Sequence, residues 1–272
     1  MLCSLLPMLV IALQFYTGDW YRAMRLAKLL ADLEVRHRDD VTLVLVRTTE
    51  CPGGKVVGEV ARRCSEVFDV EELVIRPDTP ARRARWGELG RWPVGCNVLL
   101  HGAVEHFLES DPRWTSLFMA DGGDSVPLHR NWLDILVEDH QRTVDAGLQI
   151  TGDVRRDGLG RWHVNANMVV ERSFFVDHPE VTVMPEPGEP FDMYYASTYL
   201  PASRGSSVLR CEWQKWGLRP GSFAEVAREA AWWHGYKDGH FVELAREFIL
   251  GGSHPAPVLV DRGRGSDLAD SP

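Results

Sequence analysis

The sequence predicts a mixed α/β protein in which a mostly parallel, Rossmann-like central sheet is flanked by helices within a single domain. Strand and helix patterns alternate along the first part of the chain, which is typical of a parallel sheet. The predicted strands are unbroken apolar runs, as expected where helices cover both faces of a sheet. These runs lie within residues 8–19, 41–48 and 71–77. The 272 residues are 44% hydrophobic and 25% charged, which excludes a disordered, fibrous or membrane-spanning chain.

Charge and cysteine content narrow the class of protein. The 30 Lys and Arg residues against 39 Asp and Glu residues give a net charge of −9, which argues against binding nucleic acid through bulk charge but allows a local basic patch. The five cysteines form no C-x-x-C pair, so we expect neither a zinc site nor a disulfide framework. Residues 1–14 lack a basic leader and a cleavage site, and we expect a short extension before the first strand. These features favour a cytoplasmic protein that does not engage a membrane.

Helices are expected after each of the first two strands, and a further helix and strand follow. In the first helix, apolar residues recur at i, i+4, i+7 and i+11, namely Trp20, Met24, Ala27 and Ala31, and Asp19 stands at the expected N-cap. The second helix is predicted over 54–68 and a third over 95–108. Residues 114–128 then predict a strand that ends abruptly in acids and glycines, where Pro127 bars continuation as a central strand. Because ligands of open α/β sheets bind beyond the carboxyl ends of the strands, this turn is the first place to expect a site.

The second half predicts a strand over 148–154 and helices around it. The helices are predicted over 131–146, 223–235 and 237–250. Residues 252–272 have no periodicity, so we expect a flexible C-terminal tail after a domain that spans 1–251.

Two acids flank a pair of glycines at the end of the 114–128 strand. Asp121 and Asp124 offer carboxylate oxygens on a tight turn beside open space, which suits Mg²⁺ or Mn²⁺ held together with the phosphates of a nucleotide. The alternative is a structural turn whose acids cap the next helix.

A second candidate element lies near the end of the predicted domain. In the segment Trp-His-Gly-Tyr-Lys-Asp-Gly, His234 could complete the coordination of the same metal. Lys237 could neutralise a diphosphate as it leaves. The same residues are also compatible with a helix C-cap and a solvated lysine.

A third element is the alternating run His163, Asn165 and Asn167, whose side chains would share one side of a strand. An imidazole and two amides facing one way are suited to recognising sugar hydroxyls, each of which both donates and accepts a hydrogen bond. Asparagines also occur at such positions for backbone reasons.

Taken together, these motifs resemble the metal-dependent GT-A glycosyltransferases. The chain has an acidic turn followed by Ser-Val-Pro-Leu, then H-x-N-x-N, then a late H-G-x-K-D-G, and its opening FYTGDWYRAMRLAKLL is also similar to a compact family found in phages and environmental sequences. The resemblance covers about residues 8–250. It implies a GT-A fold with a nucleotide-binding half (8–128) and an acceptor- and metal-completing half (129–251), and a UDP-sugar donor, with UDP-glucose favoured, used with Mn²⁺ or Mg²⁺.

The resemblance also assigns roles to particular residues, with one departure. It implies that Asp124 and His234 are metal ligands and that Lys237 contacts the diphosphate. The family pattern places its first acid at the position of Gly122, so the role of Asp121 is left open between a water-mediated metal contact and the ribose.

Other positions follow from the same resemblance. Thr17, Gly18 and Asp19 would approach the base and ribose, and Asn97 would lie near the donor. Asp192 would be the catalytic base or the carboxylate that orients the sugar.

The acceptor is predicted from two loops rich in Arg and Trp, over 79–92 and 153–162. Arginines pair with phosphates and aromatic rings stack on bases, so such loops could hold DNA. The family resemblance favours 5-hydroxymethylcytosine or 5-hydroxymethyluracil in DNA, which would place a viral protein in the cytoplasm of the infected host. The alternatives are an enzyme acting on a small molecule, glycan or protein, and a non-catalytic module that binds a nucleotide or sugar.

Overall fold

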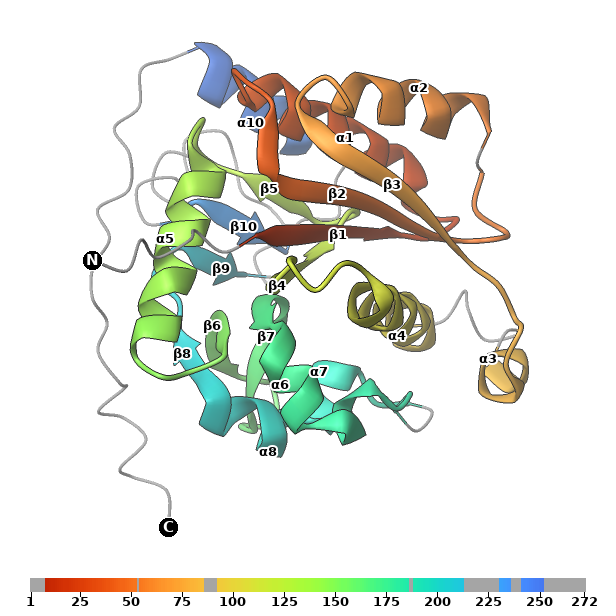
Figure 1. Cartoon of the computed structure of the whole chain (residues 1–272), viewed down its shortest axis with the longest axis vertical. Coiled ribbons are helices and arrows are strands. Elements are labelled where there is room, and N and C mark those ends of the chain that lie inside the picture. Colours follow the sequence, from red (N-terminus) through yellow and green to blue (C-terminus); the bar gives the residue numbers. More distant parts are fainter. Residues whose placement is uncertain are drawn as a thin grey trace.

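A central sheet of seven strands organises the protein (Figure 1). The structure is a computed structural model that describes residues 8–52, 54–85, 92–185, 188–212, 230–235 and 241–251. The strand order is β3-β2-β1-β4-β7-β6-β8, and β7 runs antiparallel to both of its neighbours while the other neighbouring pairs are parallel. The strands are β1 (Leu9–Phe15), β2 (Arg38–Thr48), β3 (Phe68–Ile75), β4 (Ser116–Asp121), β6 (Ile150–Arg156), β7 (Trp162–Glu171) and β8 (Ser203–Gly205). The predicted fold class, a mixed and mostly parallel sheet flanked by helices in one domain, is confirmed.

Helices cover both faces of this sheet, which explains why its strands are apolar throughout. In β1, side chains alternate between two separate cores: Leu13 packs in one and Ala12 in the other. The first core is covered by α1 (Trp20–Leu33), α2 (Lys55–Cys64), α5 (Trp132–Asp145) and α10 (Phe241–Gly251). The second is covered by α4 (Val94–Glu109), α6 (Arg172–Asp177), α7 (Phe191–Tyr194) and α8 (Ala196–Tyr199). Figure 1 shows α1, α2 and α10 on one side of β1 and β2, and α4 on the other.

Shorter elements complete the described part of the chain. They are α3 (Pro80–Arg85) and the 3₁₀ turns η2 (Pro179–Thr182) and η3 (Leu200–Ala202). The second predicted helix ends earlier than expected, at Cys64, and the second strand begins earlier, at Arg38. Among the described helices, none combines the length and apolarity needed to cross a bilayer.

A second, three-stranded sheet corrects one prediction. It consists of β5 (Ser125–Pro127), β10 (Trp232–His234) and β9 (Leu209–Cys211), with β10 in the middle. The predicted helix over 223–235 is therefore wrong at its end, because Trp232–His234 is a strand; residues 223–229 lie outside the described part. Trp232 is fully buried, and its ring lies 5.0 Å from that of Phe118. A short apolar run buried on all sides fits a strand as well as a helix, so periodicity could not separate the two.

Candidate metal and nucleotide site

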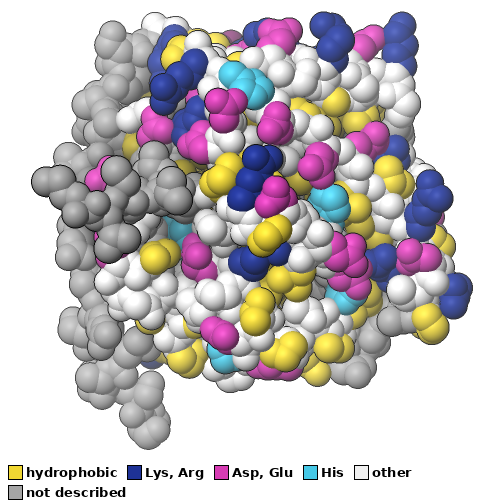
Figure 2. All heavy atoms as spheres, in the orientation of Figure 1, with side chains coloured by type: hydrophobic (Ala, Val, Ile, Leu, Met, Phe, Trp, Pro, Cys, Tyr) yellow, Lys and Arg dark blue, Asp and Glu magenta, His cyan; other side chains and the backbone are white. Residues whose placement is uncertain are grey.

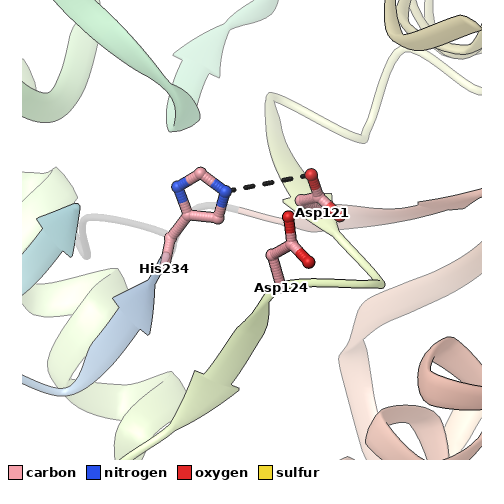
Figure 3. A group of neighbouring side chains, drawn as sticks. All are labelled: Asp121, Asp124 and His234. Carbon is pink, nitrogen blue, oxygen red and sulfur yellow. Dashed lines mark ion pairs between the residues drawn. The ribbon is translucent and has the colours of Figure 1, made fainter. Parts of the chain in front are cut away.

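Two carboxylates and an imidazole from separate parts of the chain meet at the end of the central sheet. Asp121 ends β4, Asp124 directly precedes β5, and His234 ends β10. One ligand atom from each lies within 4.8 Å of the others. The three side chains point toward one another (Figure 3), and Nε2 of His234 is 3.8 Å from Oδ2 of Asp121. The structure thus brings Asp124 and His234 together as the sequence predicted, and adds Asp121 to the group.

The backbone of the small sheet delivers His234 to this place. Strand β10 pairs antiparallel with β5, so that His234 stands opposite Ser125. The amide of Gly235 then donates a hydrogen bond of 2.9 Å to the carbonyl oxygen of Asp124. The ladder thus fixes the relative position of the backbones that carry the acid and the imidazole.

The glycines between the two acids allow the turn to pack tightly against the start of the fold. A Cβ on Gly122 would lie 2.7 Å from Cβ of Ala23 and 2.8 Å from the carbonyl oxygen of Gln14. Position 122 therefore has no room for a side chain on this backbone. The amide of Gly123 donates to Oδ1 of Asp121 at 2.9 Å and so orients that carboxylate.

Negative charge accumulates around the turn. Asp19 is buried, and burial together with the charges of Asp121 and Asp124 raises its pKa to about 8. Arg22 offers one compensating charge, since its guanidinium lies 3.4 Å from Oδ1 of Asp124. A divalent cation would neutralise the excess, and a donor set of two carboxylates and one imidazole leaves further positions for phosphate oxygens. The chemistry of these side chains thus fits Mn²⁺ or Mg²⁺.

Asp19 does not cap α1 as expected. It occupies the N-cap position, but its side chain makes no hydrogen bond to the helix. Its Oδ1 instead accepts a hydrogen bond of 2.8 Å from the amide of Tyr16, which shapes the turn after β1. The side chain therefore serves the site rather than the helix end.

A cavity of about 510 Å³ opens beside the acidic turn and collects most of the predicted site residues. Such a volume is ordinary for a small-molecule or cofactor site. Eight predicted residues line it: Asp19, Asp121, Asp124, His163, Asn165, Asn167, Asp192 and His234. Tyr16 and Gln14 at the end of β1, which the sequence analysis did not single out, line it as well.

Three predicted donor contacts do not reach this cavity. Thr17 and Gly18 lie in an exposed turn and are not part of the lining, because the turn directs Tyr16 and Asp19 inward instead. Asn97 is buried in α4 and also lies outside the lining. Its amide is used by the backbone: Nδ2 donates to the carbonyl of Glu189 at 2.9 Å, and Oδ1 accepts from the amide of Phe191 at 3.0 Å.

Lys237, the predicted contact of the diphosphate, lies outside the part of the chain that the structure describes.

Asn167 joins the strands that carry the site. Its Oδ1 accepts hydrogen bonds from the amide of Asp121 at 3.2 Å, the hydroxyl of Ser125 at 3.0 Å and the indole of Trp232 at 3.3 Å. Asn165 in turn accepts from the amide of Asn167 at 3.1 Å. The side-chain oxygen Oδ1 of Asn167 is therefore engaged in holding β4, β5 and β10 together, while the recognition of sugar hydroxyls by this residue stays a prediction.

A second pair of titratable side chains lies in the same cavity. Nε2 of His163 is 4.0 Å from Oδ2 of Asp192, and both residues are buried. Burial raises the pKa of Asp192 to about 7, and burial lowers the pKa of His163. A carboxyl group that titrates near neutral pH can accept a proton during catalysis.

The arginines of the two predicted DNA-binding loops are mostly paired with acids of this chain. Arg82 is buried and pairs with Asp78 and Glu105. Arg161 pairs with Asp157 at 2.9 Å. Elsewhere in these loops, Arg155 pairs with Asp153 and Arg156 stacks on Trp162, while residues 86–91 lie outside the described part.

The described surface shows no concentrated positive region on the face drawn in Figure 2, where Lys and Arg side chains are interspersed with Asp and Glu. Trp92, at the end of the first of these loops, lines the cavity while remaining 72% exposed.

Comparison with known proteins gives distant structural likenesses. No protein-family model matches the sequence, and no curated protein matches it. The apo structure of mouse xyloside xylosyltransferase 1 is 10% identical with a TM-score of 0.45, over 84% of this chain and 97% of that one. The apo structure of the bifunctional glycosyltransferase WbbM is 9% identical with a TM-score of 0.44, over 86% of this chain and 46% of that one. The chain spans less than half the length of WbbM.

Proposed function

We propose that this protein is a metal-dependent glycosyltransferase that moves a sugar from a UDP-sugar to a hydroxyl acceptor. The convergence of Asp121, Asp124 and His234 beside a cavity at the carboxyl ends of β1 and β4 carries the proposal. These residues would hold Mn²⁺ or Mg²⁺, which when bound supplies positive charge for the diphosphate leaving group. The motif resemblance found in the sequence agrees with this chemistry, and UDP-glucose is the donor to test first.

The chain's own side chains would divide the remaining tasks. Tyr16 and Asp19, at the end of β1, would border the nucleoside, while Lys237 would contact the diphosphate as the sequence resemblance implies. Asp192 would take the proton of the acceptor hydroxyl or orient the sugar. Its raised pKa suits the first of these roles, since it allows proton transfer near neutral pH. His163 lies close enough to influence that proton.

The arginines described in the two loops proposed for DNA are engaged by acids of this chain, which favours an uncharged acceptor over DNA. Arg82 pairs with Asp78, and Arg161 pairs with Asp157. Phosphates of a DNA backbone would have to compete with these acids for the guanidinium groups, whereas a sugar or another neutral hydroxyl compound would not. Trp92 offers such an acceptor an exposed aromatic face at the same cavity. The resemblance to the phage family still makes hydroxymethylated DNA the second acceptor to test.

The metal and nucleotide part of the proposal is tested by calorimetric titration of UDP with and without Mn²⁺. We expect Mn²⁺ to tighten UDP binding in the wild type, and Asp124→Asn and His234→Ala to remove that effect. Asp39→Asn is the matched control, because this side chain is 97% exposed. An affinity for UDP that is the same with and without Mn²⁺ would contradict the proposal and favour a non-catalytic binding module.

Transfer itself is tested with radiolabelled UDP-glucose, other UDP-sugars, and a panel of neutral glycosides alongside hydroxymethylated DNA. We expect slow metal-dependent hydrolysis of a donor sugar, lost in the same two variants, and incorporation of label into a neutral acceptor. Incorporation of label into DNA alone would reverse the choice of acceptor. Mn²⁺-dependent UDP binding with neither hydrolysis nor transfer would refute the proposal that the protein is an enzyme.

A further inference from the structure

The imidazole of His234 has a second partner on the side away from the acidic turn. Strands β9 and β10 pair in parallel with His234 beside Cys211, and Sγ of Cys211 lies 3.2 Å from Nδ1 of His234. Cys211 is 3% exposed, so its thiol is shielded from solvent. The two nitrogens of the ring therefore face different groups: Nδ1 meets the sulfur, and Nε2 faces Asp121.

We propose that Cys211 is a positioning residue of the metal site, whose sulfur accepts the Nδ1 proton of His234 and so presents Nε2 to the cation. This inference rests on the proposed function, since it requires His234 to bind metal. A neutral imidazole carries one proton, and only the nitrogen without it can bind a metal ion. When Nε2 is the ligand, the proton must reside on Nδ1, where it needs an acceptor that also fixes the ring.

The sulfur is held in place by its own backbone rather than by the metal group. The amide of Cys211 donates to Oδ2 of Asp153 at 2.8 Å, and the guanidinium of Arg155 donates to the Cys211 carbonyl. On the other side of the pair, the amide of Glu212 donates to the His234 carbonyl at 2.8 Å. Strands β6, β9 and β10 thus set the distance between the sulfur and the ring.

Cys211 also lies outside the set of atoms that could share one ion. Among the described residues, the group whose ligand atoms lie within 4.8 Å of one another comprises Asp121, Asp124 and His234, without the sulfur. Its contact with Nδ1 places it behind the imidazole instead. A sulfur acceptor is weaker than the carboxylate or carbonyl that commonly supports a metal-bound histidine. Even so, loss of such a supporting group typically weakens metal binding roughly 10- to 100-fold.

The test measures Mn²⁺ affinity in the presence of UDP by following free Mn²⁺ with electron paramagnetic resonance. We expect Cys211→Ala to weaken Mn²⁺ binding by about 10-fold or more, and Cys211→Ser, which keeps an acceptor, to retain most of the affinity. Cys64→Ala is the matched control, since Cys64 is also a buried cysteine. Its thiol donates a hydrogen bond to the carbonyl oxygen of Ala27 in α1 and not to a residue of the metal site. Wild-type affinity in Cys211→Ala, combined with loss of binding in His234→Ala, would overturn this inference and leave the proposed function standing.

A second measurement on the wild type keeps the inference testable if Cys211→Ala does not fold. Long-range ¹H–¹⁵N spectra in Mg²⁺ and UDP report which ring nitrogen of each histidine carries the proton, and His234→Gln identifies the signal. A proton on Nδ1 of His234 is expected, and a proton on Nε2 would overturn the inference. If the wild type binds neither Mn²⁺ nor Mg²⁺ with UDP, the proposed function falls and this inference falls with it.

Discussion

Replacing Asp192 with asparagine should make the free energy of unfolding less sensitive to a rise in pH from acidic to neutral values. Burial raises the pKa of this carboxyl group from 3.8 to about 7. Between those values the folded protein binds a proton at Asp192 that the unfolded chain has released, so the free energy of unfolding falls as the pH rises through this window. The neutral form contributes its full stability below the unfolded-state pKa, and that contribution is lost above the folded-state pKa.

The size of the effect follows from the shift. About three pKa units at about 1.36 kcal/mol each give roughly 4 kcal/mol between strongly acidic and alkaline conditions, of which roughly 3 kcal/mol falls between about pH 5 and about pH 8. Asparagine has nearly the same shape as aspartate but does not titrate. The free energy of unfolding of Asp192→Asn, taken relative to that of the wild type, should therefore rise by roughly 3 kcal/mol between about pH 5 and about pH 8.

Urea denaturation of both proteins at the two pH values measures this difference directly. At roughly 2–4 °C per kcal/mol, thermal melting should show a gain of about 6–12 °C for the variant relative to the wild type on going to the higher pH. Asp39→Asn is the control for removing a carboxylate at an exposed position. A constant difference between Asp192→Asn and the wild type at both pH values would refute the argument that burial controls this carboxyl group.

Two further predictions concern the acidic turn. Gly123→Ala should lower the free energy of unfolding by roughly 1–3 kcal/mol in urea denaturation, because the new Cβ would lie 2.6 Å from Oδ2 of Asp19. Gly58→Ala, whose added Cβ meets nothing within 4 Å, should show no such loss, and equal behaviour of the two would count against the packing argument. Arg22→Gln should tighten binding of Mn²⁺ alone by roughly 0.5–1 kcal/mol, because it removes a positive charge 3.4 Å from Asp124. Unchanged or weaker Mn²⁺ binding in that variant, measured by electron paramagnetic resonance, would contradict this charge argument.

The parts of the fold that the sequence predicted are those with a strong local pattern. An unbroken apolar strand such as β1 requires burial wherever it lies, and so does the apolar face of the helix that begins at Trp20. The local sequence pattern was therefore enough to predict both elements. The strand β10 was missed because its three residues are extended only through pairing with β5 and β9, which are remote in the sequence. An apolar run buried on all sides contains no periodicity that reveals such partners.

The candidate site divides in the same way. Asp124 and His234 stand in short motifs with chemically distinctive residues, which made both of them candidate ligands of one metal. That the two meet depends on the pairing of β5 with β10. The position of Asn97 depends instead on the backbone of residues 189–191, with which its amide bonds. Cys211 belongs to no motif, and its relation to His234 exists only through the parallel register of two short strands. A pattern of residue types cannot reveal a contact that register alone creates.

The central claim is that Asp121, Asp124 and His234 bind one divalent cation together with a nucleotide diphosphate. Anomalous diffraction from crystals grown with Mn²⁺ and UDP tests it directly. The account predicts one strong manganese peak at coordination distance from Nε2 of His234 and from carboxylate oxygens of the acidic turn, with the diphosphate completing the shell. Ordered UDP without manganese at this turn, or manganese bound elsewhere, would contradict it.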